Sequence, residues 1–157
     1  NDALFDALET GVVKRYITDF GTEELLNKPN VTVFPHVGGS TSEAELNCAI
    51  MAAQTIRRFM ETGEIVNSVN FPRVQQALSA PYRITLINKN VPNIVARIST
   101  AVSDFNINID NIINRSKGDY AYTLLDLDET DKSKIDELVA KFEASDNIVR
   151  VRLIKGK

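Results

Sequence analysis

The amino-acid sequence predicts an α+β protein made of two unlike parts. Short runs of alternating apolar residues indicate strands, and longer segments with apolar residues every three or four positions indicate helices. Between them, residues 73–80 follow one proline, precede another and show no sustained period, which is typical of a linker. We therefore expect one unit over residues 1–72, a linker over 73–80 and a second unit over 81–157.

The composition is that of an ordinary globular protein. The chain has 157 residues, 43% of them hydrophobic and 25% charged, with a net charge of −3. These values favour a packed core, and the lack of a basic block argues against nucleic acid or an anionic membrane as a partner. Cys48 lies among apolar residues, so we expect a buried thiol and a cytoplasmic protein. The chain begins inside a predicted helix, and we expect it to be a piece of a longer protein.

The first unit is predicted to be an incomplete α/β segment of the Rossmann type. Gly11 suits the left-handed residue that follows a helix, and Ser42 and Glu45 have the spacing of a capping box at the start of a long helix. Two strands and two helices are too few to cover both faces of a parallel sheet. We expect helices over 2–10 and 42–62, strands over 15–19 and 31–34, and an extended segment over 65–71.

The second unit is predicted to be a complete ferredoxin-like domain. We expect strands over 82–88, 107–116, 120–128 and 148–154, a helix that begins at Pro92, and a helix over 133–144. Lys117-Gly118-Asp119 is a hairpin signal. The order strand, helix, strand, strand, helix, strand defines the split βαβ motif, whose helices lie on one face of the sheet. The other face and the edges would be free to pair with another copy, so we expect a homodimer through residues 81–157.

The single histidine, His36, is the candidate for chemistry in the first unit. An imidazole on a loop after a strand can exchange a proton near neutral pH, given a carboxylate to orient it. The candidate carboxylates, which precede His36 in the sequence, are Asp19, Glu23 and Glu24. A strand-end histidine with one hydrogen bond is the alternative interpretation. Gly38 and Gly39 match neither of the two glycine-rich motifs that bind phosphate groups, the P-loop and the dinucleotide-binding motif. We therefore interpret them as a flexible turn. One histidine and one cysteine predict no metal site.

Two blocks of the first unit resemble the D-3-phosphoglycerate dehydrogenase family. They are Pro35-His-Val-Gly-Gly-Ser-Thr41 and Val66-Asn-Ser-Val-Asn-Phe-Pro72. Residues 1–72 resemble the end of the family's nucleotide-binding domain, and residues 81–157 resemble the ACT regulatory domain that ends many members. The resemblance implies NAD-dependent oxidation of 3-phosphoglycerate, the first step of L-serine biosynthesis.

The resemblance also implies roles for individual residues. His36 matches the catalytic acid/base, Glu23 is the candidate to hold its imidazole (Glu24 stays open), and Asp19 matches a residue that binds the nicotinamide carboxamide. Gly38 and Gly39 match a mobile turn beside that site. The family's glycine fingerprint and its substrate-binding arginine are absent from these residues. We therefore expect NAD to bind the full-length protein and not this chain alone, and this chain alone to be inactive.

The ACT resemblance predicts an effector site between two copies. Asn90 and Asn108 match the two asparagines that meet a small amino acid across the interface, with L-serine as the candidate effector. Asn88 stands where relatives with serine feedback have histidine, and Asn93 replaces a glycine. Asparagines that merely cap turns are the alternative. A free-standing ACT-type amino-acid sensor without catalysis is the alternative function. An RNA-binding ferredoxin-like domain is disfavoured by the acidic charge.

Overall fold

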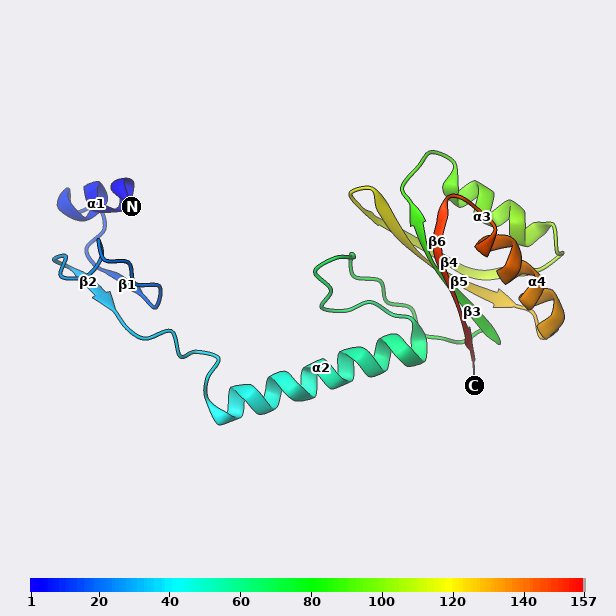
Figure 1. The fold of residues 1–157 in the computed structure, drawn as a ribbon, viewed down its shortest axis with the longest axis horizontal. Coiled ribbons are helices and arrows are strands. Elements are labelled where there is room, and N and C mark those ends of the chain that lie inside the picture. Colours follow the sequence, from blue (N-terminus) through cyan, green and yellow to red (C-terminus); the bar gives the residue numbers. More distant parts are fainter. Residues whose placement is uncertain (157) are drawn as a thin grey trace. The chain divides into compact units, whose positions relative to one another are not determined.

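The chain contains two compact units, each with its own sheet. The computed structural model describes residues 1–156 and divides them into Asn1–Met51 and a second unit from Ala52 onward (Figure 1). The long helix α2 (Ser42–Thr62) contains the division. None of the helices within residues 1–156 is long and apolar enough to cross a membrane.

The first unit is built on two short parallel strands. After α1 (Asp2–Glu9), Gly11 has a φ of +73°, as its position after a helix predicted. The strands β1 (Tyr16–Thr18) and β2 (Val31–Val33) pair in parallel. Leu25, at 4% exposure, is the one buried residue of this unit, whereas Phe20 is 72% exposed. Such exposed apolar side chains are typical of a surface that another segment or chain covers.

The helix α2 has the predicted length but a different cap. The backbone N–H of Ala44 donates to Oγ1 of Thr41 over 3.1 Å, so Thr41 and not Ser42 is the N-cap. The predicted capping box is therefore wrong by one residue, because the hydroxyl of Thr41 already satisfies the free amide. No residue of α2 is buried, and the expectation of a buried thiol is wrong as well, since Cys48 is exposed. Most apolar side chains of this helix are exposed, among them Leu46, Ile50, Ile56 and Met60.

The second unit has the predicted ferredoxin-like order, which confirms the fold class. Its four strands form an antiparallel sheet in the order β4-β5-β3-β6. The elements in chain order are β3 (Tyr82–Lys89), α3 (Ile94–Ser103), β4 (Asn108–Lys117), β5 (Tyr120–Asp128), α4 (Lys132–Glu143) and β6 (Ile148–Lys155). Gly118, with a φ of +63°, makes the predicted hairpin turn between β4 and β5.

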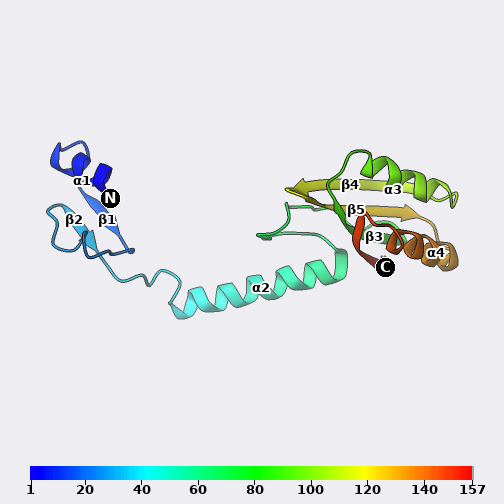
Figure 2. The same ribbon diagram turned by 45° about the horizontal axis from the view of Figure 1, so that its top comes forward.

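Helices α3 and α4 both lie on one face of this sheet (Figure 2). Alternate residues of β3 and β5, among them Ile84 and Leu125, point toward them and are 0% exposed. Facing residues of the helices complete this main core: Ile94, Ile98, Val102, Ile135, Leu138 and Phe142. Side chains alternate with a period of two along the strands, and apolar residues repeat about every 3.6 positions along the helices. The apolar side chains of both kinds of element therefore pack together at one interface.

The helix α3 begins two residues later than predicted. Its N-cap is Asn93, which has a left-handed backbone with a φ of +64°, and Arg97 donates its backbone N–H to the carbonyl of Asn93 over 3.0 Å. Pro92 therefore lies in the preceding turn and not in the first helical turn. Asparagine tolerates this backbone conformation better than most residues, so the change of direction falls at Asn93.

The second face of the sheet is covered by the chain's own residues 63–80, which we call the strap. Ile65 and Val74 pair as an isolated bridge and pack against Tyr122 and Leu124 of β5. Val74 is 1% exposed. The expectation that this face is free for another copy is therefore wrong, and residues 73–80 lie on the sheet. The division of the chain into catalytic remnant, linker and regulatory domain stays a prediction.

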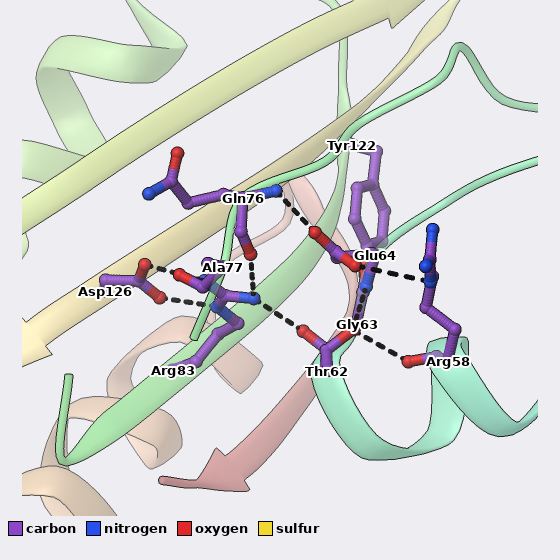
Figure 3. A network of polar contacts seen from close by, with 9 residues as sticks. All are labelled: Arg58, Thr62, Gly63, Glu64, Gln76, Ala77, Arg83, Tyr122 and Asp126. Carbon is purple, nitrogen blue, oxygen red and sulfur yellow. Dashed lines mark hydrogen bonds and ion pairs between the residues drawn. The ribbon is translucent and has the colours of Figure 1, made fainter. Parts of the chain in front are cut away.

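Polar side chains of the sheet donate hydrogen bonds to the end of α2 and to the start of the strap (Figure 3). Arg83 donates to the carbonyl of Thr62 over 2.8 Å, and the hydroxyl of Tyr122 donates to the carbonyl of Gly63 over 2.6 Å. Arg152 donates to the carbonyls of Phe59 and Met60. The last carbonyls of a helix lack partners within the helix, so these bonds satisfy them from the sheet.

Coverage of both faces explains the burial of the central strands. All residues of β5 from 121 to 127 are buried, and β3 is buried along nearly its whole length. The parts of the sheet that remain open are its two edges, β4 and β6.

Candidate functional site

His36 and Asp19 meet at the carboxyl ends of the two parallel strands. Asp19 directly follows β1, and His36 follows β2 by three residues. Because parallel strands end at the same edge of a sheet, the two side chains converge there, and Nδ1 of His36 lies 3.3 Å from Oδ2 of Asp19. This edge is where α/β sheets place their ligands.

The loop after Asp19 is fitted closely to β2 and His36. Phe20 packs its ring edge-on against the imidazole, with ring centroids 4.5 Å apart. A Cβ on Gly21 would lie 2.6 Å from Cγ1 of Val33, so only glycine fits at this approach. The sequence analysis did not single out Phe20 or Gly21. A glycine two residues after the candidate aspartate was the available signal.

Neither glutamate considered for this site pairs with His36 within residues 1–156. Oε2 of Glu24 accepts a hydrogen bond from Nδ2 of Asn1 over 2.6 Å. Glu23 is exposed, and within residues 1–156 no contact joins it to His36, so its role stays a prediction. Gly38 and Gly39 are exposed with open space where a Cβ would stand.

The His36–Asp19 pair is suited to proton transfer. A carboxylate on one ring nitrogen fixes the orientation of the imidazole and leaves the other nitrogen for a substrate. The side chain of His36 is 57% exposed, so a substrate could reach it. Within residues 1–156 no three or more His, Cys, Asp or Glu side chains are grouped as a metal would require.

The chain fits only one end of an NAD molecule. Asp19 can accept a hydrogen bond from the carboxamide, as the resemblance implies. A pyrophosphate needs a glycine turn between a strand and a helix. The left-handed glycines among the described residues lie elsewhere: Gly11 and Gly63 follow helices, and Gly118 turns a hairpin. The pyrophosphate half of the cofactor therefore has no cradle within residues 1–156.

The two asparagines predicted for an effector lie near opposite ends of the β4–β5 hairpin. Asn90 follows β3, and its Nδ2 donates to the carbonyl of Gly118 in the hairpin over 3.0 Å. Asn108 begins β4 opposite Asp128, at the far end of the same hairpin. Strand β4 spans about 30 Å at its usual rise per residue. Within one chain, therefore, the two asparagines cannot contact the same small molecule.

The side chain of Asn88 makes all its hydrogen bonds inside the domain. It is 0% exposed, its Nδ2 donates to the carbonyl of Lys89 over 3.0 Å, and its Oδ1 accepts from Thr123 over 2.8 Å. A ligand could take this amide only by leaving a buried group unpaired. Thr123 was not singled out from the sequence, because a threonine in an apolar strand gives no distinct signal.

Comparisons with known proteins find relatives with similar sequences over most of the chain. Over 85% of its length the chain is similar to D-3-phosphoglycerate dehydrogenase 2 of Saccharomyces cerevisiae, with 32% identity over 139 residues. The D-3-phosphoglycerate dehydrogenase of Escherichia coli K12 is 26% identical over 133 residues. The chain spans 29% and 32% of the lengths of these two relatives. The predicted resemblance is thus confirmed. No protein-family profile matches the chain.

Solved structures also contain similar folds. The ACT domain of GTP pyrophosphokinase from Chlorobium tepidum covers 46% of this chain and 95% of its own, with 18% identity and a TM-score of 0.43. The regulatory subunit of aspartate kinase from Thermus thermophilus covers 49% of this chain and 52% of its own, with 23% identity and a TM-score of 0.37. At these scores the likeness is not evidence of a shared activity.

Proposed function

We propose that this chain is part of an NAD-dependent D-3-phosphoglycerate dehydrogenase and carries both a proton-transfer group and an amino-acid-binding regulatory domain. The observation that carries the proposal is the similarity to D-3-phosphoglycerate dehydrogenases over 85% of the chain. The meeting of His36 with Asp19 supports it, since a 2-hydroxy-acid dehydrogenase needs an acid/base at this edge of its sheet.

His36 is the proposed catalytic residue. Its free ring nitrogen accepts the hydroxyl proton of the 2-hydroxy acid, and Asp19 holds the ring through Nδ1. NAD, when bound to the complete enzyme, accepts the hydride. Because residues 1–156 form no cradle for the pyrophosphate, residues outside this chain hold most of the cofactor, and the 157-residue chain by itself is inactive.

The reduction of NAD by 3-phosphoglycerate tests this part. A longer protein that contains these residues is expected to reduce NAD, its His36→Ala variant to lose at least about a hundredfold in kcat, and the 157-residue chain to show no turnover. A Glu45→Ala variant, changed at an exposed residue of α2, is the control. Unchanged turnover after His36→Ala would overturn the assignment of His36.

The second unit is proposed to be an ACT domain that binds its effector between two copies. Both faces of the sheet are covered, and β6 lies beside the end of α2, where Arg152 donates to Phe59. Of the two open edge strands, β4 is the one proposed for pairing, because it begins at Asn108 and ends at the hairpin that Asn90 contacts. Antiparallel pairing of β4 with β4 of a second copy would bring Asn90 of one protomer near Asn108 of the partner subunit. In such a dimer the two predicted effector residues would contact the same ligand, although they lie far apart within one chain.

Calorimetric titration of the chain with L-serine tests the effector site. Wild type is expected to bind in a dimer, and both Asn90→Ala and Asn108→Ala to weaken binding by about tenfold or more, since each removes a hydrogen bond to a charged ligand. Asn70→Ala, an exposed asparagine of the strap, is the matched control. The absence of heat at millimolar serine, or a monomer by light scattering at every concentration, would overturn this part.

A further inference from the structure

A cavity of about 260 Å³ lies on the second face of the four-stranded sheet, beside the edge strand β6. The end of α2 forms one wall with Phe59 and Met60, and the sheet contributes Ile87 and Tyr122. Two arginines of β6 complete the site. Within residues 1–156 the strap contributes nothing to this lining, so the cover of the second face is incomplete at this point.

The strand register places the two arginines on the same face as the floor of the cavity. Ile87 of β3 lies opposite Tyr122 of β5 and opposite Arg150 of β6. Side chains alternate between the two faces of a strand, so Arg152, which follows Arg150 by two positions, leaves the same face. The floor is therefore a row of largely apolar side chains that ends in guanidinium groups at the edge of the sheet.

The two arginines differ in what they contact. Two guanidinium nitrogens of Arg152 donate to the carbonyls of Phe59 and Met60, and its Cζ lies 5.0 Å from the ring centroid of Phe59. Arg150 is exposed, and within residues 1–156 it makes no ion pair and no side-chain hydrogen bond. No carboxylate in this part of the chain pairs with Arg152 either. The cavity therefore carries two positive charges, and one of the two guanidinium groups has its donors available.

Apolar walls and an available guanidinium together define the chemistry of a ligand. Phe59, Met60 and Ile87 offer carbon surface, which a fully hydrated ion such as phosphate would not cover. A neutral apolar molecule would leave the guanidinium of Arg150 without an anion. A carboxylate matches a guanidinium through two parallel hydrogen bonds, and an attached carbon chain matches the walls. The volume lies just below the usual range of sites for drug-sized ligands, so the carbon chain must be short.

We propose that this cavity binds a small carboxylate with an apolar body of about four to six carbons. The carboxylate accepts hydrogen bonds from Arg150, and Arg152, which the end of α2 holds in place, adds a second positive charge. The carbon chain lies against Ile87 and Met60. The asparagines of the candidate effector site do not line this cavity, so the inference does not depend on the proposed function.

Carbon-13 NMR of the chain labelled at its methionine methyl groups tests the site, because the chain has only two methionines. Met60 lines the cavity, whereas Met51 is an exposed residue of α2 that does not. Titration with isocaproate at constant ionic strength is expected to shift the Met60 signal to saturation and to leave the Met51 signal unchanged. Acetate has the charge without the body, and isocaproamide has the body without the charge. Both are expected to bind at least about tenfold more weakly, since each lacks one half of the contacts.

Two arginine variants separate a built site from general attraction of an anion. Arg150→Gln removes the available guanidinium from an exposed position and is expected to weaken isocaproate binding by about tenfold or more. Arg115→Gln is the matched control, because Arg115 is exposed on the other edge strand, lies opposite Tyr122 on the same face and does not line the cavity. It should leave the affinity unchanged. The proposal is overturned if isocaproate does not shift the Met60 signal, if acetate binds as tightly as isocaproate, or if the two variants weaken binding equally.

Discussion

Arg83 and Asp126 form a fully buried ion pair between β3 and β5, with Nε to Oδ1 at 2.5 Å and Nη2 to Oδ2 at 2.7 Å. Both side chains are 0% exposed. The other N–H groups of the guanidinium donate to the carbonyls of Thr62, Gln76 and Ala77, so all five of its donors are used. One arginine thus joins the end of α2, the strap and the sheet (Figure 3).

Removing one member of this pair is expected to be severe. Arg83→Met leaves Asp126 charged and unpaired, and it frees three backbone carbonyls on the strap side. Loss of one partner of a buried pair lowers the free energy of unfolding by about 3–5 kcal/mol. Urea unfolding of the variant, followed by circular dichroism, measures the loss.

Two comparison variants show whether the effect comes from the buried charge. Arg57→Met removes an exposed pair with Glu61 on α2, whose side chains are 76% and 59% exposed, and should change stability by less than about 0.5 kcal/mol. The double variant Arg83→Met/Asp126→Leu should recover part of the loss, because no unpaired charge remains. Equal effects of Arg83→Met and Arg57→Met would contradict this account of the pair.

The strap should contribute to the stability of the sheet through Val74. Val74 is 1% exposed against Tyr122 and Leu124, so Val74→Ala is expected to lower the free energy of unfolding by about 2 kcal/mol. Val69 lies in the same segment but is 84% exposed, and Val69→Ala should have almost no effect. Similar midpoints of urea unfolding for the two variants would show that the strap is not packed on the sheet.

The turn from α2 into the strap requires glycine for two separate reasons. Gly63 has a φ of +71°, and a Cβ there would lie 2.5 Å from Cγ2 of Thr85 and 2.9 Å from Cδ1 of Ile154. The left-handed backbone alone costs about 1–2 kcal/mol for alanine. The clash adds to this, so Gly63→Ala should lower the free energy of unfolding by about 3 kcal/mol or more.

Gly118 provides the matched control for the clash. It has a φ of +63° in the same unit, with nothing within 4 Å of an added Cβ. Gly118→Ala should therefore show only the backbone part of the loss. If calorimetry gave the two alanine variants the same melting temperature, the close approach of Gly63 to the sheet would be refuted.

The regular elements could be predicted because their apolar residues repeat with the period of the element. The structure has α2 over the predicted residues 42–62, and the four strands of the second sheet lie within about one residue of their expected bounds. The strap could not be predicted in this way, because Ile65 and Val74 are single apolar residues in a segment without a period. The burial of Arg83 could not be predicted for the same reason, since nothing in the sequence indicated that the strap covers it.

The candidate sites also differ in how far the sequence could predict them. The approach of Asp19 to His36 follows from the rule that parallel strands end at one edge, although the sequence analysis gave the orienting role to Glu23. The hydrogen bonds that join Thr123 to Asn114 and Asn88 depend on the register in which Asn114 and Thr123 are opposed on β4 and β5. Register is a property of the paired strands, and a single sequence without an alignment does not specify it for isolated polar residues.

Tyr122 should make the second unit sensitive to alkaline pH. Burial raises the pKa of its phenol above the ordinary value of 10.0, against smaller opposing effects from a hydrogen bond with Thr85 and from Arg152 and Arg83. The folded state therefore holds the proton more tightly than the unfolded state. The corresponding stabilisation is fully present below pH 10.0 and is lost as the pH rises through the higher pKa of the folded protein.

The test compares how steeply stability falls with pH in three proteins. From about pH 9 to pH 11 the free energy of unfolding of wild type should fall more steeply than that of Tyr122→Phe, which has no proton to lose. At neutral pH the same variant should be about 1 kcal/mol less stable, because the carbonyl of Gly63 loses its donor. Tyr120→Phe, on the same strand and 48% exposed, should keep the wild-type slope. Parallel slopes for wild type and Tyr122→Phe would mean that the buried phenol ionises as freely as an exposed one, and that the strap does not shield it.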